Sequence, residues 1–257
     1  ALASGTPPLT GKIFLITGSG RGLGKCLAQH LSSLGATIVV NSFHSRAAGE
    51  TTTAELLASG YRAFHLWGSV ANPAHIERMM AWIDSELGAL DGIVSSASNG
   101  ALARQPEMLP EQLELAFRTN AVALHLLAMR GAPLLRRRGG GRIVALSSSS
   151  AHQYVEYQSA QGPAKAALES MVRYLALELG DSNIQVNAVC CGPIYGELLS
   201  RYPEGDRLVP LWESRTPGKR LCSEQDIAHV VEFLLSDKAR MINGSTVKVD
   251  GGMSLRG

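Results

Sequence analysis

The stretch Thr17-Gly-Ser-Gly-Arg-Gly-Leu-Gly24 joins an apolar run of β-prone residues, Ile13 to Thr17, to a helical pattern over about 22–34. The apolar run suits a strand that is buried on both faces. Glycines between a strand and a helix let the backbone approach a pyrophosphate, which free N–H groups and the helix dipole then hold. The spacing is G-x-x-x-G-x-G rather than G-x-G-x-x-G. A flexible turn would contain the same glycines, but the strand–loop–helix context favours a dinucleotide site.

The residues after the second expected strand indicate which nicotinamide cofactor is bound. An NAD site places an acidic residue at the end of this strand, whereas the 2′-phosphate of NADP needs positive charge there. The chain reads Asn41-Ser-Phe-His-Ser-Arg46, with no carboxylate before Glu50. Arg21 and Arg46 can reach a phosphate, and Ser45 can donate a hydrogen bond. Solvated surface arginines are the alternative interpretation, but the pattern favours NADPH.

Strand-like and helical patterns alternate along the chain. The strand-like runs fall near 13–17, 37–41, 63–67, 92–95, 142–147, 184–189 and 245–249. The helical patterns fill about 22–34, 46–59, 73–87, 110–136, 159–180 and 224–236. They predict a single α/β domain over residues 1–257, a Rossmann-type doubly wound parallel sheet of seven strands with helices on both faces. The Pro- and Arg-rich segment 195–221 follows the sixth strand at its carboxyl end, where ligands bind, and is predicted to be a substrate lid.

Composition limits the other classes of function. The 257 residues fit one domain, and a net charge of +2 with scattered basic residues argues against a nucleic-acid partner. The four cysteines and seven histidines show no metal-ligand spacing, so no metal is expected. Without a disulfide framework, a reduced, cytoplasmic setting is predicted. No apolar run approaches about 18 residues, so no membrane span is expected.

Further motifs follow the glycine loop in a fixed order. They are Thr119-Asn-Ala121, Arg142-Ile-Val-Ala-Leu-Ser-Ser148, Pro163-Ala-Lys-Ala-Ala-Leu168, Val186-Asn-Ala-Val189 with Gly192-Pro-Ile194, and Val249-Asp-Gly-Gly252. Together they resemble, over essentially the whole chain, the short-chain dehydrogenase/reductase family, whose cofactor loop reads TGxxxGxG. The resemblance implies that Ser148 is the catalytic serine and Lys165 the active-site lysine. It also implies that Asn120 is the family asparagine, which either orders a water chain or only holds a helix bend.

The resemblance also implies which residues contact the cofactor. They are Gly18, Ser19, Arg21, Gly22, Leu23, Gly24, Ser45, Arg46, Ser69, Val70, Ser96, Ala97, Lys165, Pro193 and Ile194. Some positions depart from the family: Ser95-Ser-Ala-Ser98 stands where the family has Asn-Asn-Ala-Gly. Ser69 replaces an acidic or Asn residue near the adenine, and Gly196 replaces a threonine on the nicotinamide side. These departures affect details of cofactor contact.

The departure with the largest chemical consequence is Gln161. The family motif Y-x-x-x-K places a tyrosine one helical turn before Lys165, on the same helix face. A glutamine amide can donate a hydrogen bond there but cannot give up a proton. The usual proton relay for carbonyl reduction is therefore broken.

A subgroup with a shifted tyrosine, the NADPH-dependent enoyl-thioester reductases, resembles the C-terminal third of the chain. In that subgroup the catalytic tyrosine lies seven residues before the lysine, but here that position is Gln158. Tyr157 is one residue away, and Tyr154 lies eleven before Lys165. Two interpretations stay open: Tyr157 supports an enolate oxygen by a small change at the helix start, or both tyrosines only pack at the pocket wall.

Three hypotheses follow for the activity. The first is an NADPH-dependent reductase of 2-enoyl thioesters, with acyl-CoA or acyl carrier protein as the substrate. The second is a ketoreductase or alcohol dehydrogenase with a substitute proton donor, and the third is a cofactor-binding protein without redox turnover. A homotetramer is also predicted, because the apolar residues of the helix over 164–179 are too many to face the sheet. These residues are Ala166, Leu168, Met171, Val172, Leu175, Ala176 and Leu179.

Overall fold

The computed structural model describes residues 6–99 and 102–256. Within these residues, seven strands form one parallel sheet in the order β3-β2-β1-β4-β5-β6-β7. The strands are β1 (Ile13–Ile16), β2 (Thr37–Ser42), β3 (Ala63–Trp67), β4 (Gly92–Ser95), β5 (Gly141–Ser148), β6 (Ile184–Cys191) and β7 (Thr246–Val249). The predicted seven-stranded parallel sheet is therefore confirmed.

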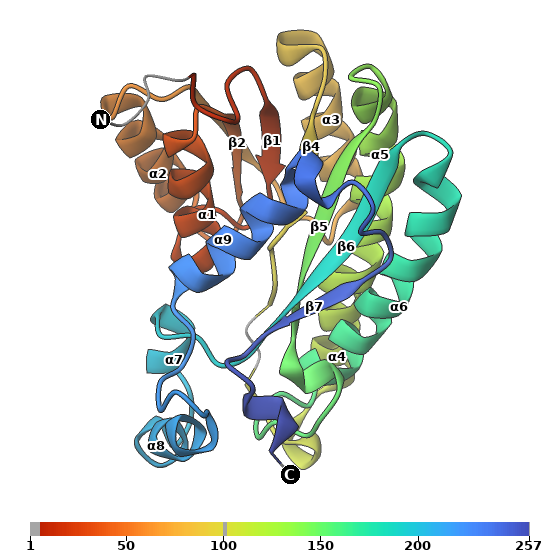
Figure 1. Cartoon of the computed structure of the whole chain (residues 1–257). Coiled ribbons are helices and arrows are strands. Elements are labelled where there is room, and N and C mark those ends of the chain that lie inside the picture. The colour runs from red at the N-terminus through yellow and green to blue at the C-terminus, as the bar shows by residue number, and fades with distance from the viewer. Residues whose placement is uncertain (1–5, 100–101, 257) are drawn as a thin grey trace, which may run out of the picture.

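Helices cover both faces of the sheet (Figure 1). One face carries α1 (Gly22–Ser33), α2 (Arg46–Ala58) and α9 (Glu224–Leu235); the other carries α3 (Pro73–Leu87), α5 (Ala123–Arg136) and α6 (Gln161–Gly180). The strand order reverses between β1 and β4, so the loops that leave these strands diverge at their carboxyl ends. Two short helices of the predicted lid, α7 (Glu197–Ser200) and α8 (Gly205–Arg215), lie beyond that end of the sheet (Figure 1).

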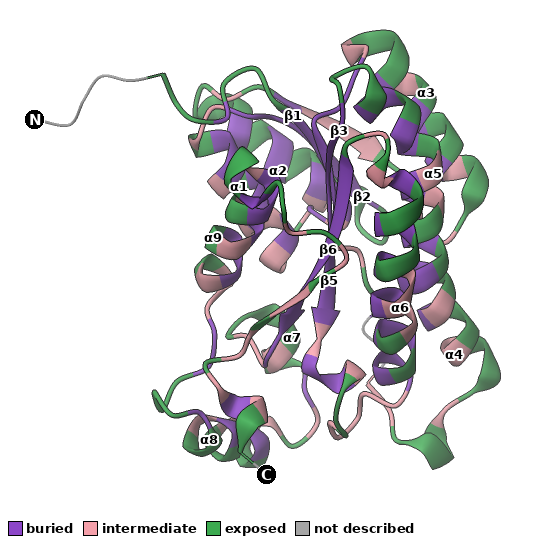
Figure 2. Ribbon diagram, turned by 45° about the vertical axis from the view of Figure 1, so that its right-hand side comes forward, coloured by how far each residue is buried: buried purple, intermediate pink, exposed green. Residues whose placement is uncertain are grey.

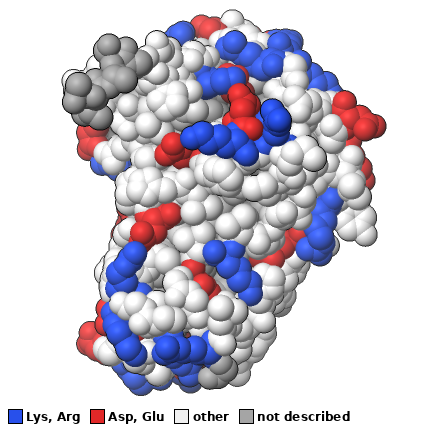
Figure 3. Space-filling model, viewed as in Figure 1, with Lys and Arg blue, Asp and Glu red and all other residues white. Residues whose placement is uncertain are grey.

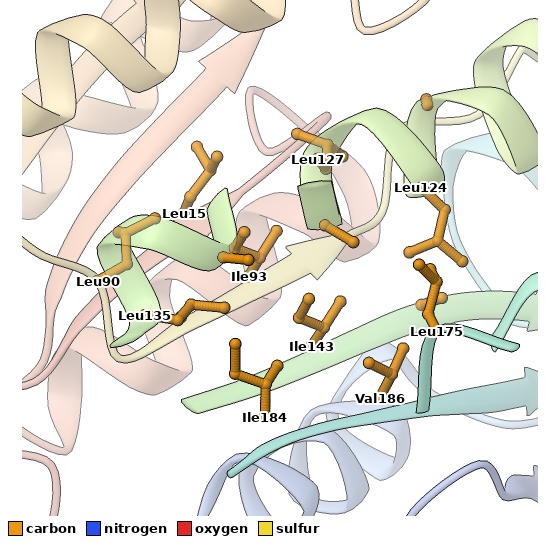
Figure 4. Close-up of a cluster of buried hydrophobic side chains, with 14 of the residues drawn as sticks. Leu15, Leu90, Ile93, Leu124, Leu127, Leu135, Ile143, Leu175, Ile184 and Val186 are labelled. Carbon is orange, nitrogen blue, oxygen red and sulfur yellow. The ribbon is translucent and has the colours of Figure 1, made fainter. Parts of the chain in front are cut away.

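Alternating side chains along the strands contribute to two separate cores. Leu15, Ile93 and Ile143 belong to the core under α3, α5 and α6 (Figure 4). Phe14 and Ile16, on the opposite face of the same β1 strand, belong to the core under α1 and α9. The central strands are therefore buried along their whole length (Figure 2). This burial on both faces explains why the strands read as continuous apolar runs.

The helical pattern expected over 110–136 is divided in the structure. It forms α4 (Pro110–Phe117), a π-helical turn (Arg118–Val122) and α5. Asn120 lies in the π-helical turn, and its Nδ2 donates to the Ala116 carbonyl at 2.8 Å. The asparagine thus satisfies a backbone acceptor where the regular helix is interrupted.

The prediction of a tetramer assumes that the apolar residues of this helix, α6, are too many to face the sheet. Most of these residues do pack inside this chain, so the assumption is wrong for them. Leu168, Val172, Leu175, Ala176 and Leu179 are all buried in the core of this chain, and Met171 packs against it. Ala166 is exposed, and the large exposed apolar side chains of α6 are Tyr174 and Leu177, which are 65% and 83% exposed. None of the described helices is long and apolar enough to span a membrane.

Candidate active site

The glycine loop approaches its neighbours too closely for any side chain at two positions. A Cβ added at Gly24 would lie 2.3 Å from the Gly18 carbonyl oxygen, and one at Gly18 would lie 2.7 Å from Ala97 Cα. The Thr17 hydroxyl accepts from the backbone N–H groups of Ser96 and Ala97, at 3.0 and 3.1 Å. These contacts fix the end of β1 to the loop after β4 and leave the N-terminus of α1 open toward the space between them.

A pocket of about 470 Å³ extends from this loop to the lid. Most of the residues predicted from the sequence line it: Gly18, Arg21, Gly22, Leu23, Gly24, Ser45, Ser69, Val70, Ser96, Ala97, Ser148, Lys165, Pro193 and Ile194. The structure thus brings together side chains from β1 to β6 and from the lid.

Four predicted residues are not among the residues that line the pocket: Ser19, Arg46, Asn120 and Tyr157. Ser19 is fully buried, where its hydroxyl donates to the Ile16 carbonyl and accepts from the Asn41 N–H. Arg46 points to the surface and pairs with Glu50 at 2.9 Å. Sequence position alone could not show these side-chain directions.

The pocket end beyond β2 is polar and has no carboxylate in the segment that follows the strand. Asn41, Ser42, Phe43, His44 and Ser45 all line it, and no acidic residue stands in this run. Phe43 and His44 were not predicted from the sequence, although both lie in the segment that was used to argue for NADPH.

Arg21 is the arginine of the glycine loop that lines this pocket. Its guanidinium pairs with Glu197 of α7 at 3.0 Å, and both side chains are about half exposed. The pair connects the glycine loop to the lid across the pocket mouth.

Lys165 is buried on α6, one turn after Gln161. Its Nζ donates to the Leu146 carbonyl at 2.6 Å. Burial lowers the pKa of this ammonium to about 8, because desolvation disfavours the charged form. The lysine is therefore still largely protonated at neutral pH but titrates close to it.

Gln161 is buried and held at both ends of its amide. Its Oε1 accepts from the Ser98 hydroxyl at 3.2 Å and from Asn120 Nδ2 at 3.4 Å. Its Nε2 donates to Asn99 Oδ1 at 3.1 Å. The side chain at the family's tyrosine position is thus an amide in a network of hydrogen bonds, and no group in the network ionises. Asn99 lines the pocket but was not predicted, although it directly follows Ser95–Ser98, the segment that departs from the family motif.

Ser148 and Tyr157 have separate environments. The Ser148 hydroxyl donates to Gln158 Oε1 at 3.3 Å and accepts from the Ser150 hydroxyl at 3.0 Å. The Tyr157 hydroxyl donates to Glu204 of the lid, and this hydrogen bond raises the pKa of the tyrosine. Arg104 also donates to Tyr157, at 3.1 Å, and its guanidinium stacks over the ring. Tyr157 therefore joins the lid to the loop after β4 instead of facing the pocket.

The substrate end of the pocket is mostly apolar. It is lined by Leu102, Leu115, Val155, Leu198, Leu199 and Trp212. Tyr202 and Trp212 of the lid pack edge to face, with 5.1 Å between ring centroids. Such a wall suits an acyl chain or a ring system.

One group of potential metal ligands forms from residues that are far apart in sequence. His152, Glu169 and Cys190 place potential metal-ligand atoms within 4.8 Å of one another. The group is explained as the surroundings of one buried carboxylate: Glu169 pairs with His152 at 2.8 Å and accepts from the Ser147 hydroxyl. Both of its oxygens thus have partners from the protein itself.

Comparison with known proteins identifies the family. The sequence model described as enoyl-(acyl carrier protein) reductase matches residues 18–254. The chain belongs to the short-chain dehydrogenase/reductase family. Versicolorin reductase 1 of Aspergillus parasiticus is 33% identical over 95% of this chain and 97% of its own. The 1-cyclohexenylcarbonyl-CoA reductase of Streptomyces collinus is 34% identical over 95% of this chain and 87% of its own.

A solved structure of the same family shows the fold and a cofactor. The gluconate 5-dehydrogenase of Burkholderia cenocepacia, determined with NADP and tartrate, superposes with a TM-score of 0.90. It is 26% identical and covers 97% of this chain and 98% of its own. These relatives act on different substrates, so short-chain dehydrogenase/reductase membership establishes an oxidoreductase family and not one substrate.

The geometry of this short-chain dehydrogenase/reductase site fits a nicotinamide dinucleotide. The close approach at Gly18 and Gly24 leaves the backbone of the loop bare, as a pyrophosphate requires. Lys165 lies near the other end of the pocket, where it can hold the nicotinamide ribose. The glycine loop and the lysine of the family are therefore both at the pocket, whereas the family's tyrosine is replaced by Gln161.

Proposed function

We propose that this protein is an NADPH-dependent reductase of conjugated 2-enoyl thioesters. The observation that carries the proposal is Gln161, whose amide oxygen accepts from Ser98 and Asn120 and whose Nε2 donates to Asn99. A ketone reductase needs an acid that protonates the developing alkoxide. An amide cannot serve as that acid.

Reduction of an enoyl thioester makes a smaller demand on the protein. NADPH, when bound, supplies the hydride that forms the new C–H bond at the β-carbon. The C=C electron pair then moves onto the thioester oxygen as an enolate, and water can protonate the α-carbon. The site must therefore stabilise negative charge on one oxygen, and the Lys165 ammonium contributes a positive charge to the same pocket.

The identity of one relative supports this choice of substrate. The Streptomyces collinus relative is named for the reduction of a conjugated, ring-bearing CoA thioester. The apolar wall of the pocket here suits a ring or chain of this kind. For the cofactor, Arg21 and the absence of an acidic residue after β2 favour NADPH over NADH.

We propose that the CoA or carrier-protein portion of the thioester binds near the basic side chains of the lid. Lys and Arg side chains gather over the end of the molecule where α7 and α8 lie (Figure 3). They include Arg201, Arg207, Arg215, Lys219 and Arg220, all exposed. Arg201 also lines the pocket. A phosphate of CoA or of an acyl carrier protein is the complementary charge.

A homotetramer is the proposed assembly. The exposed Tyr174 and Leu177 of α6 are apolar side chains that a second subunit would cover. Light scattering at micromolar concentration should give the tetramer mass, and a monomer mass would contradict the proposal.

The enzymatic proposal is tested by NADPH oxidation with three matched reactions. The purified protein is given crotonyl-CoA, acetoacetyl-CoA or no acceptor, and the loss of NADPH absorbance is followed. We expect turnover with the enoyl thioester, and we expect a cyclic enoyl-CoA to react if the ring-bearing relative is a guide. Turnover with acetoacetyl-CoA alone would identify a ketoreductase, and no turnover with any acceptor would favour a binding protein.

A further inference from the structure

We propose that Asn99 binds the carbonyl oxygen of the substrate and stabilises the enolate through its side-chain N–H. Gln161 and Asn120 are positioning residues that turn the Asn99 amide to present this donor. The inference rests on the proposed function, because it assigns the group that receives the charge in that reaction. It also explains what the glutamine does at the family's tyrosine position.

The orientation of the amides can be followed from a fixed point. The Ala116 carbonyl can only accept, so the end of Asn120 that lies 2.8 Å from it is the donor, Nδ2. The same Nδ2 lies 3.4 Å from Gln161, and the atom of Gln161 facing it is therefore the acceptor, Oε1. The Ser98 hydroxyl can donate to the same oxygen, at 3.2 Å.

The other end of the Gln161 amide is therefore the hydrogen-bond donor, Nε2. It lies 3.1 Å from Asn99, which must present Oδ1. The remaining Asn99 atom is Nδ2, which carries two hydrogens. The Ala116 carbonyl thus fixes the orientation of the Asn120 amide, which fixes that of Gln161, which in turn fixes that of Asn99. Asn99 is the member of this chain of hydrogen bonds whose N–H groups are left for the pocket.

The Asn99 N–H groups are placed to meet a ligand. Within residues 6–99 and 102–256, no protein atom accepts a hydrogen bond from Asn99 Nδ2. Asn99 is 9% exposed, and it belongs to the pocket lining. A buried donor that lines the pocket and has no protein acceptor among the described residues is the arrangement that an oxyanion site requires.

Three other candidate donors of the pocket each direct at least one hydrogen to a protein acceptor. Ser148 donates its one hydroxyl hydrogen to Gln158. Lys165 directs one of its three N–H groups to the Leu146 carbonyl, and its charge suits an interaction at longer range. Gln161 uses one of its two N–H groups for Asn99 itself, whereas neither side-chain N–H group of Asn99 has an acceptor among residues 6–99 and 102–256. A fixed, neutral donor at Asn99 fits an enolate, because the charge is delocalised and no proton transfer to the oxygen is needed.

The test compares Asn99→Ala and Asn99→Asp with the wild type. Both changes remove the N–H donor, and Asn99→Asp keeps the size of the side chain. We expect kcat with crotonyl-CoA to fall by about 10²-fold or more, as for other oxyanion donors. The Kd for NADPH should stay within about twofold, because cofactor contacts are elsewhere. Asn72→Asp, at the exposed N-cap of α3, is the control for the chemical change.

Gln161→Glu tests the positioning role. A carboxylate at this position can only accept, so the Asn99 amide should turn its N–H groups toward residue 161 and its oxygen toward the pocket. We expect kcat to fall nearly as far as in Asn99→Asp. The double variant should lose no more than the worse single variant, because both changes remove one interaction. Losses that multiply would contradict the relay.

The outcomes separate this inference from the proposed function. A kcat of Asn99→Ala or Asn99→Asp within about threefold of wild type, in folded protein by circular dichroism, would overturn the role of Asn99. If the wild type reduces only a 3-ketoacyl thioester, the proposed function fails, and the same variants are then measured with that substrate. A loss of kcat there would retain Asn99 as the carbonyl donor, whereas unchanged kcat would refute both.

Discussion

Cofactor selection should depend on one of the two arginines that the sequence indicates. Arg21 lines the pocket beside the segment after β2, whereas Arg46 is outside the pocket lining and is paired with Glu50. Arg21→Ala should therefore weaken the binding of NADPH but not of NADH, because only NADPH carries the 2′-phosphate. Arg46→Ala is the matched control on the same surface.

The size of the effect follows from two opposing terms. A charge-assisted hydrogen bond to the phosphate contributes about 1.5–3 kcal/mol. To bind the phosphate, Arg21 must give up its ion pair with Glu197. Exposed ion pairs of this kind contribute about 0–1 kcal/mol. The net loss in Arg21→Ala is then about 0.5–3 kcal/mol, or roughly 2- to 160-fold in Kd.

The assay is isothermal titration of each variant with NADPH and with NADH. The Kd for NADH should stay within about twofold in Arg21→Ala, and Arg46→Ala should change neither cofactor by more than about twofold. Equal affinity of the wild type for the two cofactors would refute the reasoning. A loss of NADPH affinity in Arg46→Ala alone would show that the other arginine turns into the site.

Three further predictions concern the catalytic end of the pocket. Gln161→Tyr should not produce an efficient ketoreductase, and steady-state kinetics with acetoacetyl-CoA should show turnover far below that of the wild type with crotonyl-CoA. Lys165 has a pKa lowered to about 8, so kcat should fall as pH rises through that value and the ammonium is lost; a flat profile from pH 7 to about 9.5 would contradict a role for the charge. Tyr157→Phe should change kcat by less than about fivefold, because its hydroxyl is held by Glu204 outside the pocket lining; a loss of about 10²-fold would place the acid role there.

Much of the fold could be predicted because its signals are local in sequence. The glycine loop, the alternation of strands and helices, and the buried apolar strands each depend on residues close along the chain. The lining of the cofactor end follows from the same motifs, since Gly18 to Gly24 and Pro193 to Ile194 lie directly after strands.

The substrate end could not be predicted in this way. The expectation that Tyr157 could reach the site assumed a helix that extends back from Lys165 to residue 159. In the structure α6 begins at Gln161. Tyr157 lies before the helix, in a left-handed conformation with φ of 62°. Its partners are Arg104 and Glu204, 53 and 47 residues away. Likewise Asn99 meets Gln161 across 62 residues, a contact that only the packing of α6 against the loop after β4 creates.

The most direct test of the central claim is the destination of the hydride. NADPH labelled with deuterium at the transferring position of the nicotinamide is incubated with the protein and crotonyl-CoA, and the product is examined by mass spectrometry and NMR. The account predicts saturated butyryl-CoA with one deuterium on the β-carbon and a proton from water on the α-carbon. Two results together would contradict the account. Crotonyl-CoA would be recovered unlabelled, and in a parallel reaction with acetoacetyl-CoA the deuterium would be found on the carbinol carbon of 3-hydroxybutyryl-CoA.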